Sequence, residues 1–227
     1  DELARLQINA LVNFPEGREF NPQQREMWVR FFDLLLSEQD QNNALGFTQP
    51  LEPDMILNPV KDWLDSGDDD AITGLTGAET DYYRQMEPSY ACRNGPFRHI
   101  SELLRVRNIT PKLFFRLDEN LGIRNFITVH GMSPARGSRH DFSFEGKINI
   151  NTADVPVIAA LLPMGQAFLA PEIAAFREET MGEEYVYDLT SPTWYQQVPG
   201  MEEVEIDSSL VTVKSDLFRI HCAARVN

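Results

Sequence analysis

Apolar residues recur at helical spacing through the first half of the chain. The segment after Asn21-Pro22 has the strongest pattern, and Asn followed by Pro is a typical helix start, with Asn as the cap and Pro at the first helical position. Shorter helices are predicted after Asn58-Pro59, Ser101 and Thr110-Pro111. The first helix carries a broad apolar face made of Met27, Trp28, Phe31, Phe32, Leu35 and Leu36. We therefore expect a helical block up to about residue 125.

The pattern changes after residue 125, where short strand-like runs alternate with helical segments. Helices are predicted at residues 155–162 and 171–179. The predicted strands lie at residues 126–131, 147–150, 201–206, 209–215 and 217–226. Another strand-like run ends the segment from Leu3 to Asn13. We therefore predict an α+β protein, in which residues 1–20 and 126–227 form one α+β domain and residues 21–125 form an inserted α-helical domain.

Composition and charge narrow the class of protein. The chain has 227 residues, of which 42% are hydrophobic, so it can bury a core of its own. Its 20 Lys and Arg stand against 35 Asp and Glu, which gives a net charge of −15. Such an acidic surface repels nucleic-acid phosphates and anionic lipid headgroups, and it favours cations and basic protein partners. No apolar run approaches the ~20 residues of a membrane helix, and no signal-peptide pattern opens the chain.

Six carboxylates follow Trp63 within the segment KDWLDSGDDDAITGLTGAETDYY, residues 61–83. Carboxylates this close repel one another unless water or a cation separates them. Calcium takes roughly 6–8 oxygen ligands from flexible segments, although the EF-hand pattern fails here because Gly67 stands at its third position. The segment is therefore either a solvated acidic loop or a calcium site. Its candidate ligands are Asp65, Asp68, Asp70, Glu79 and Asp81.

Other chemistry finds little support in the sequence. There is no GxSxG, HExxH, P-loop or GxGxxG motif, so we do not expect an enzyme. Residues 99–117 and 150–178 resemble helix-hairpin-helix units, which in DNA-binding proteins bring backbone N–H groups to a phosphate. Basic residues cluster near the first unit, at Arg98, Arg105, Arg107 and Lys112. A nucleic-acid-binding module is the alternative function, but the acidic charge of the whole chain opposes it, and we expect these units to be packing elements.

Four motifs follow one another along most of the chain from about Asn58 to Asn227. They are DWLDSGDDD…GAETDYY, GPFRHISELLRVRNITPKLFFRL, KININTA and VKSDLFRIHCAARV. In this order they resemble general secretion pathway protein K, the family of large minor pseudopilins of bacterial type II secretion systems. The chain departs from the family pattern at Thr80, where the family has Asp, at Leu104, where it has Arg, and at Asn108, where it has Gly. At Thr80 the chain therefore lacks one carboxylate that the family pattern offers as a calcium ligand.

The resemblance implies a fold, a location and partners. The fold would be pilin-like, with an antiparallel sheet packed on a helix and a large α-helical domain inserted into it. A hydrophobic N-terminal helix, absent from this fragment, would anchor the protein in the bacterial inner membrane and leave this domain in the periplasm. The protein would cap the pseudopilus tip together with the I and J minor pseudopilins. Its helical domain would bind calcium in the region that matches Asp65 to Asp81.

Two cysteines, Cys92 and Cys222, allow at most one disulfide, and two buried free thiols are the alternative. The oxidising compartment that the resemblance implies would permit a bridge between them. We therefore predict a non-enzymatic, calcium-binding minor pseudopilin that supports protein export and binds no nucleic acid.

Overall fold

Helix α1 (Pro22–Ser37) is the longest helix in the computed structural model, which describes residues 1–37, 50–67, 72–115, 122–134, 141–182, 184–220 and 222–225. Its predicted cap is confirmed, because the backbone N–H of Gln24 donates to Oδ1 of Asn21 at 3.3 Å. The apolar face is buried and packs against both α2 (Pro53–Leu64) and α5 (Val155–Leu161). Helix α1 therefore joins elements from the two halves of the chain.

Helix α2 begins at Pro53, whereas the sequence predicted a start at Asn58-Pro59. Pro53 occupies the start of the helix, where a missing N–H costs nothing, and Pro59 lies inside the helix. An internal proline leaves the carbonyl four residues earlier, that of Met55, without its helical donor. The side chain of Asn108 supplies one, since its Nδ2 donates to Met55 O at 2.8 Å. The helix continues through Pro59 because a distant residue satisfies this carbonyl.

Five further short helical segments lie among the described residues up to residue 125. They are η1 (Ile8–Leu11), α3 (Thr80–Tyr83), η3 (Ile100–Arg105), α4 (Pro111–Phe115) and η4 (Ile123–Asn125). The helix predicted after Ser101 is present as the 3-10 helix η3, which is closed by a reciprocal cap. The N–H of Ser101 donates to His99 Nδ1 at 3.2 Å, and the N–H of His99 donates to Glu102 Oε1 at 2.9 Å. The predicted helix start at Thr110-Pro111 is confirmed by α4.

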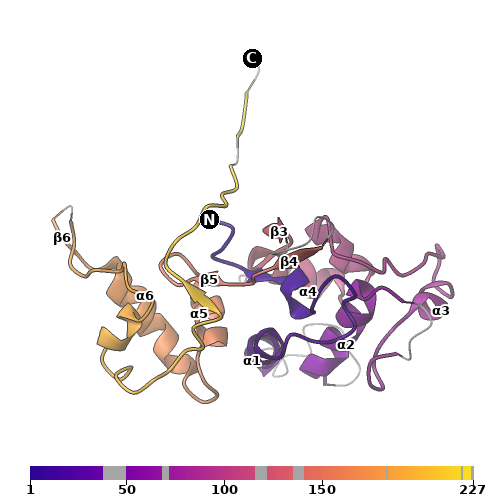
Figure 1. Ribbon diagram of the computed structural model, residues 1–227, viewed down its shortest axis with the longest axis horizontal. Coiled ribbons are helices and arrows are strands. Elements are labelled where there is room, and N and C mark those ends of the chain that lie inside the picture. The colour runs from indigo at the N-terminus through magenta and orange to yellow at the C-terminus, as the bar shows by residue number, and fades with distance from the viewer. Residues whose placement is uncertain are drawn as a thin grey trace.

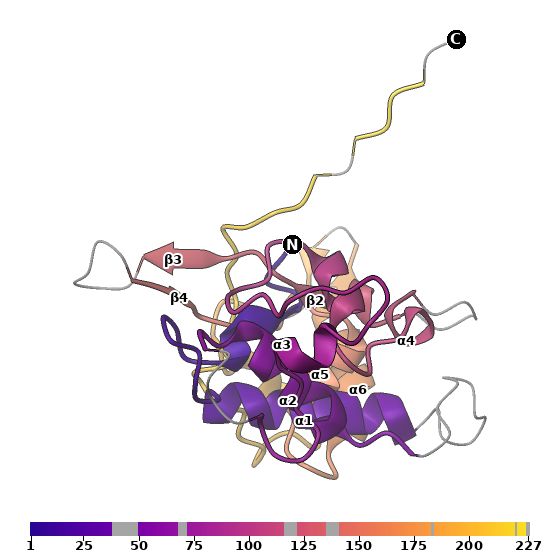
Figure 2. The ribbon, with the colours of Figure 1, turned by 90° about the vertical axis from the view of Figure 1, so that its right-hand side faces the viewer.

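In the described part of the chain, the strands form two-stranded pairs rather than the single antiparallel sheet that we expected. Two pairs are parallel, and they join β1 (Leu6–Gln7) to β2 (Ile127–Thr128) and β5 (Ile148–Asn149) to β8 (Val211–Thr212). Two are antiparallel, and they join β3 (Met132–Pro134) to β4 (Phe142–Phe144) and β6 (Thr180–Met181) to β7 (Glu184–Tyr185). The β3–β4 hairpin projects from one side of the molecule (Figure 2). The chain is thus a mixed α and β protein with small sheets.

Side-chain turns explain why two of the strands stop after two residues. Directly after β1, the side chain of Gln7 accepts the N–H of Asn9 at 3.1 Å. Directly after β5, Asn149 accepts the N–H of Asn151 at 3.1 Å in the same way. Such local bonds compete with a continuing strand ladder. The sequence shows an apolar run at both places but not this competition.

The C-terminal half contains α5, η5 (Ala167–Leu169), α6 (Ala170–Glu178) and η6 (Trp194–Gln197). Both predicted helices are confirmed, but the strands predicted at residues 201–206 and 217–226 are wrong for the described residues. Residues 201–206 fold through turns, for example with Val204 N donating to Met201 O at 3.0 Å. The described residues after Leu217 form no strand. Arg219 still pairs with Glu2, with 2.8 Å between Nε and Oε1, and the chain then extends away from the body toward its C-terminus (Figure 1).

One hydrophobic core contains residues from Leu6 to Val211 and so crosses both predicted domain boundaries. Asn9 adds a polar cross-link, since its buried amide donates to the carbonyls of Phe97 and Val129 and accepts the N–H of Phe97. The division at residues 20 and 125 stays a prediction. Among the described residues, the helices are all too short or too polar to cross a bilayer.

Candidate cation site

The C-terminal end of α2 places two carboxylates close together. Asp62 lies in the last turn of the helix, and Asp65 is its C-cap. Trp63 between them is buried and packs edge-on against Tyr83, with 5.2 Å between the ring centroids. This aromatic contact anchors the end of α2 against the returning segment that carries Glu79.

Asp62 is fully buried and organises the turn over residues 73–78. Its carboxylate accepts the N–H of Thr73 at 3.1 Å and the N–H of Ala78 at 2.8 Å. Gly77 closes this turn, because its N–H donates to Thr73 O at 3.0 Å. A Cβ at Gly77 would overlap with the Asp62 carboxylate, which explains the glycine of the GAET motif. The absence of a side chain at Gly77 therefore allows the turn to approach the Asp62 carboxylate this closely.

Asp65 is buried beneath the N-terminal turn that contains Gly17. A Cβ at Gly17, which has a φ of 70°, would come within 3.0 Å of the backbone of Asp65, and Ser66 N donates to Glu16 O at 2.9 Å. The Asp65 carboxylate accepts the N–H of Gly67 at 3.3 Å and lies 3.3 Å from Nζ of Lys61. Burial raises the pKa of the Asp65 carboxyl, while the bonds from Gly67 and Lys61 act in the opposite direction.

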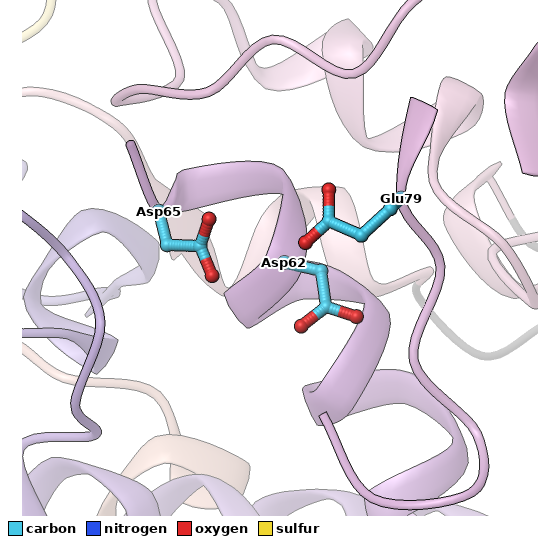
Figure 3. A group of neighbouring side chains, drawn as sticks. All are labelled: Asp62, Asp65 and Glu79. Atoms are coloured by element: carbon cyan, nitrogen blue, oxygen red, sulfur yellow. The ribbon is translucent and has the colours of Figure 1, made fainter. Parts of the chain in front are cut away.

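Glu79 precedes α3 and completes a group of three buried carboxylates. One oxygen each from Asp62, Asp65 and Glu79 lies within 4.8 Å of the others. Figure 3 shows the carboxylates of Asp65 and Glu79 pointing toward one another, with that of Asp62 beside them. We call Asp62, Asp65 and Glu79 the carboxylate cluster. It brings together the end of α2 and the segment before α3.

The electrostatics of the carboxylate cluster favour a cation. Three carboxylates so close together repel one another, and burial removes the water that would screen them. Two of them, Asp62 and Asp65, also lie at the C-terminal end of α2, where the helix dipole is negative. Carboxylate oxygens from separate segments are the ligands that calcium takes. The donor set therefore fits a hard, oxygen-preferring ion.

The structure places the predicted ligands in different environments. It brings Asp65 and Glu79 together, whereas Asp81 is exposed and lies 3.5 Å from Arg84. Asp68 and Asp70 lie outside the described residues. The sequence reasoning missed Asp62, although the spacing of Asp62 and Asp65 on either side of a buried Trp places both at one helix end. Only the turn that encloses Asp62 shows that its carboxylate faces inward.

Thr80, which departs from the family pattern, has a structural contact of its own. Its hydroxyl accepts the backbone N–H of Cys92 at 3.0 Å. The thiol of Cys92 is buried and donates to Asp62 O at 3.3 Å, while Cys222 is exposed near the C-terminus. Both cysteines are free thiols in this structure, so a bridge between them is not formed, and the alternative of two buried thiols holds for Cys92 but is wrong for Cys222.

The hairpin at Arg107-Asn108 is half-buried and packs against neighbouring segments. Asn108 has a φ of 67°, the left-handed conformation that the glycine of the family pattern would adopt without strain. Arg107 donates to Gly77 O at 3.2 Å, and its guanidinium lies 4.9 Å from the centre of the Tyr82 ring. These residues hold the segment of Glu79 against α2, so the hairpin acts here as a packing element.

Comparison with models of protein families identifies the family of this chain. Residues 4–123, just over half of the chain, match the family described as type II secretion system (T2SS), protein K. The matched range includes the carboxylate cluster and the Arg107-Asn108 hairpin. The chain therefore belongs to the type II secretion system protein K family. No protein with a curated description matches the chain.

Comparison with solved structures shows a likeness of fold. Five chains of known structure match. One belongs to the crystal structure of the GspK-GspI-GspJ complex from the type 2 secretion system of enterotoxigenic Escherichia coli, with a TM-score of 0.59 and 17% sequence identity. The match covers 95% of this chain but 64% of the other, so this chain spans somewhat less than two thirds of that structure. The likeness shows a shared fold.

Proposed function

We propose that this chain is a minor pseudopilin of a type II secretion system, where it caps the pseudopilus tip with the I and J minor pseudopilins. The observation that carries the proposal is the family match over residues 4–123. The fold shared with a chain of the GspK-GspI-GspJ complex supports it. The role would be structural rather than enzymatic, and the fold would correspond to a pilin-like domain with a helical insertion, whose described strands form two-stranded pairs. The domain described here would lie in the periplasm, next to the inner membrane.

The assembly claim is tested by mixing this chain with the soluble domains of the I and J proteins from the same organism. Size-exclusion chromatography with light scattering gives the mass of the complex. We expect one species that contains all three chains, and a smaller one or none when either I or J is left out. Separate elution of the three proteins at micromolar concentration, with each shown to be folded, would contradict the assignment of the partners.

We also propose that the carboxylate cluster binds calcium. Asp62, Asp65 and Glu79 supply three buried carboxylates, and Asp68 and Asp70, which lie between Asp65 and Glu79 in the sequence, remain candidate ligands. A bound divalent ion would offset the repulsion among the carboxylates and hold the end of α2 to the segment before α3. Binding to the folded state alone would stabilise the protein in proportion to the logarithm of the calcium concentration. Calcium would thus act as a structural ion.

Thermal unfolding and titration calorimetry test this site in protein that has been freed of metal with a chelator. We expect calcium to raise the melting temperature, and Asp65→Asn and Glu79→Gln to weaken calcium binding at least tenfold. Asp81→Asn is the matched control, because it removes one nearby carboxylate that is exposed and outside the cluster. Equal losses in Asp81→Asn and Asp65→Asn would contradict the cluster as the site. No response of the wild-type protein to calcium would contradict calcium binding altogether.

A further inference from the structure

Lys61 places a positive charge directly at the carboxylate cluster. It lies on α2 four residues before Asp65, and its Nζ is 3.3 Å from Asp65 Oδ2. The lysine side chain is 12% exposed and that of Asp65 is 2% exposed, so water screens this pair far less than a surface pair. Lys61 is therefore part of the environment of the cluster rather than a solvated surface charge.

The neighbouring arginines, Arg84 and Arg107, contact groups outside the carboxylate cluster. Arg107 donates to Gly77 O and lies over the ring of Tyr82, and Arg84 lies beside the exposed Asp81. The pair of Lys61 with Asp65 also has the order that contributes less in an isolated helix, in which an acidic residue before a lysine is preferred. We attribute the contact to the burial of Asp65 near other carboxylates, which makes a positive charge favourable at this point.

We propose that Lys61 is an internal counter-cation that competes with calcium for Asp65. The inference rests on the calcium site proposed above. Without calcium, the ammonium group offsets part of the repulsion in the carboxylate cluster and keeps the end of α2 folded. When calcium binds, it takes Asp65 as a ligand, and the flexible four-carbon stem of Lys61 lets the ammonium group move toward solvent. Lys61 thereby lowers the affinity of the site for calcium below that of its carboxylates alone.

The competition predicts a gain in affinity when the charge is removed. Lys61→Met keeps most of the apolar stem and removes the ammonium group, and we expect it to bind calcium about tenfold more tightly than the wild type by titration calorimetry. Lys112→Met is the matched control, because it makes the same change in net charge at an exposed position on α4. We expect the affinity of Lys112→Met to stay within about twofold of the wild type.

A second measurement separates competition from a simple loss of repulsion at long range. In the presence of chelator, Lys61→Met should melt at a lower temperature than Lys112→Met, because its carboxylate cluster has lost its counter-charge. The rise in melting temperature on adding calcium should then be larger in Lys61→Met. Lys61→Gln, which keeps a polar end group, should show the same two effects, and circular dichroism should confirm that both variants are folded.

The outcomes distinguish this inference from the calcium site itself. Equal calcium affinities in Lys61→Met and Lys112→Met, in a protein that does bind calcium, would overturn the competition and leave the site intact. A lower affinity in Lys61→Met would also overturn it, since Lys61 would then be positioning the ligands. If neither the wild type nor Lys61→Met binds calcium, both the site and the competition are refuted. Binding by Lys61→Met alone would contradict a calcium site in the native chain, and with it the competition at that site.

Discussion

The side-chain amide of Asn108 donates a hydrogen bond to the backbone carbonyl of Met55 at 2.8 Å. This carbonyl is the one that Pro59, inside α2, leaves without a helical donor. The same Asn108 adopts a φ of 67°, which a glycine would adopt without strain, but glycine has no amide side chain to donate. Asparagine therefore meets two requirements at this position, a left-handed backbone and a donor for α2.

We expect Asn108→Gly to lower the free energy of unfolding by about 1 kcal/mol, because it keeps the backbone conformation and removes the hydrogen bond. Asn108→Ala should cost roughly 1 kcal/mol more, because alanine disfavours positive φ. Urea denaturation measures both changes. Pro59→Ala restores a backbone N–H that can bond Met55 O, so Asn108→Gly should have a smaller effect in that background. An unchanged effect there would show that the two positions are not coupled.

A substitution at Gly77 tests how closely the turn over residues 73–78 packs against Asp62. Gly77→Ala places a Cβ against the Asp62 carboxylate and 2.6 Å from Thr73 N, so we expect it to destabilise the protein by about 1–3 kcal/mol. It should also weaken calcium binding, because it displaces Asp62. Gly95→Ala is the control, since a Cβ there meets no atom within 4 Å. Similar melting temperatures for the two variants would contradict the close fit at Asp62.

We expect the buried phenol of Tyr83 to make the protein less stable at alkaline pH. Its ring is buried, and burial raises the pKa of the phenol above its ordinary value, against the opposing effect of the N–H of Arg107 that bonds the hydroxyl at 3.3 Å. In the unfolded chain the phenol loses its proton at about pH 10, whereas in the folded chain it keeps the proton to higher pH. The folded chain then binds more protons, so the free energy of unfolding falls as the pH rises above about 10.

Tyr83→Phe should flatten this decrease between about pH 10 and 11, as measured by urea denaturation across the pH range. At neutral pH the same variant should be less stable by about 1 kcal/mol, because it loses the hydrogen bond from Arg107. Tyr185→Phe changes an exposed tyrosine and is the control. A wild-type pH profile that Tyr83→Phe does not change would show that this phenol is not responsible.

The two cysteines should differ in reactivity. Cys222 is exposed and should react rapidly with a thiol reagent in the folded protein, whereas Cys92 is buried and should react only after unfolding. Cys222→Ser should remove the rapid phase and leave the slow one. If denatured protein without reductant shows no reactive thiol, a disulfide joins the two cysteines in solution.

Local patterns in the sequence were sufficient for several elements. The apolar face of residues 21–36 and its Asn-Pro start predicted α1, and short apolar runs predicted β2 and β5. These features depend on the period of the side chains and on caps within one turn, which neighbouring residues specify. The acidic segment also pointed to Asp65 and Glu79, because their carboxylates lie within one short stretch of chain.

Contacts between distant segments select the carboxylates that come together. Asp62 joins the carboxylate cluster and Asp81 does not, because the turn at Gly77 encloses the one while the other faces water. Contacts between distant residues likewise decided that α2 begins at Pro53, since Asn108 satisfies the carbonyl of Met55. The spacing of apolar residues and the composition were enough to predict the periodic elements and the excess of negative charge. Burial, which depends on contacts between segments far apart in the chain, determined where that charge concentrates and hence where a cation fits.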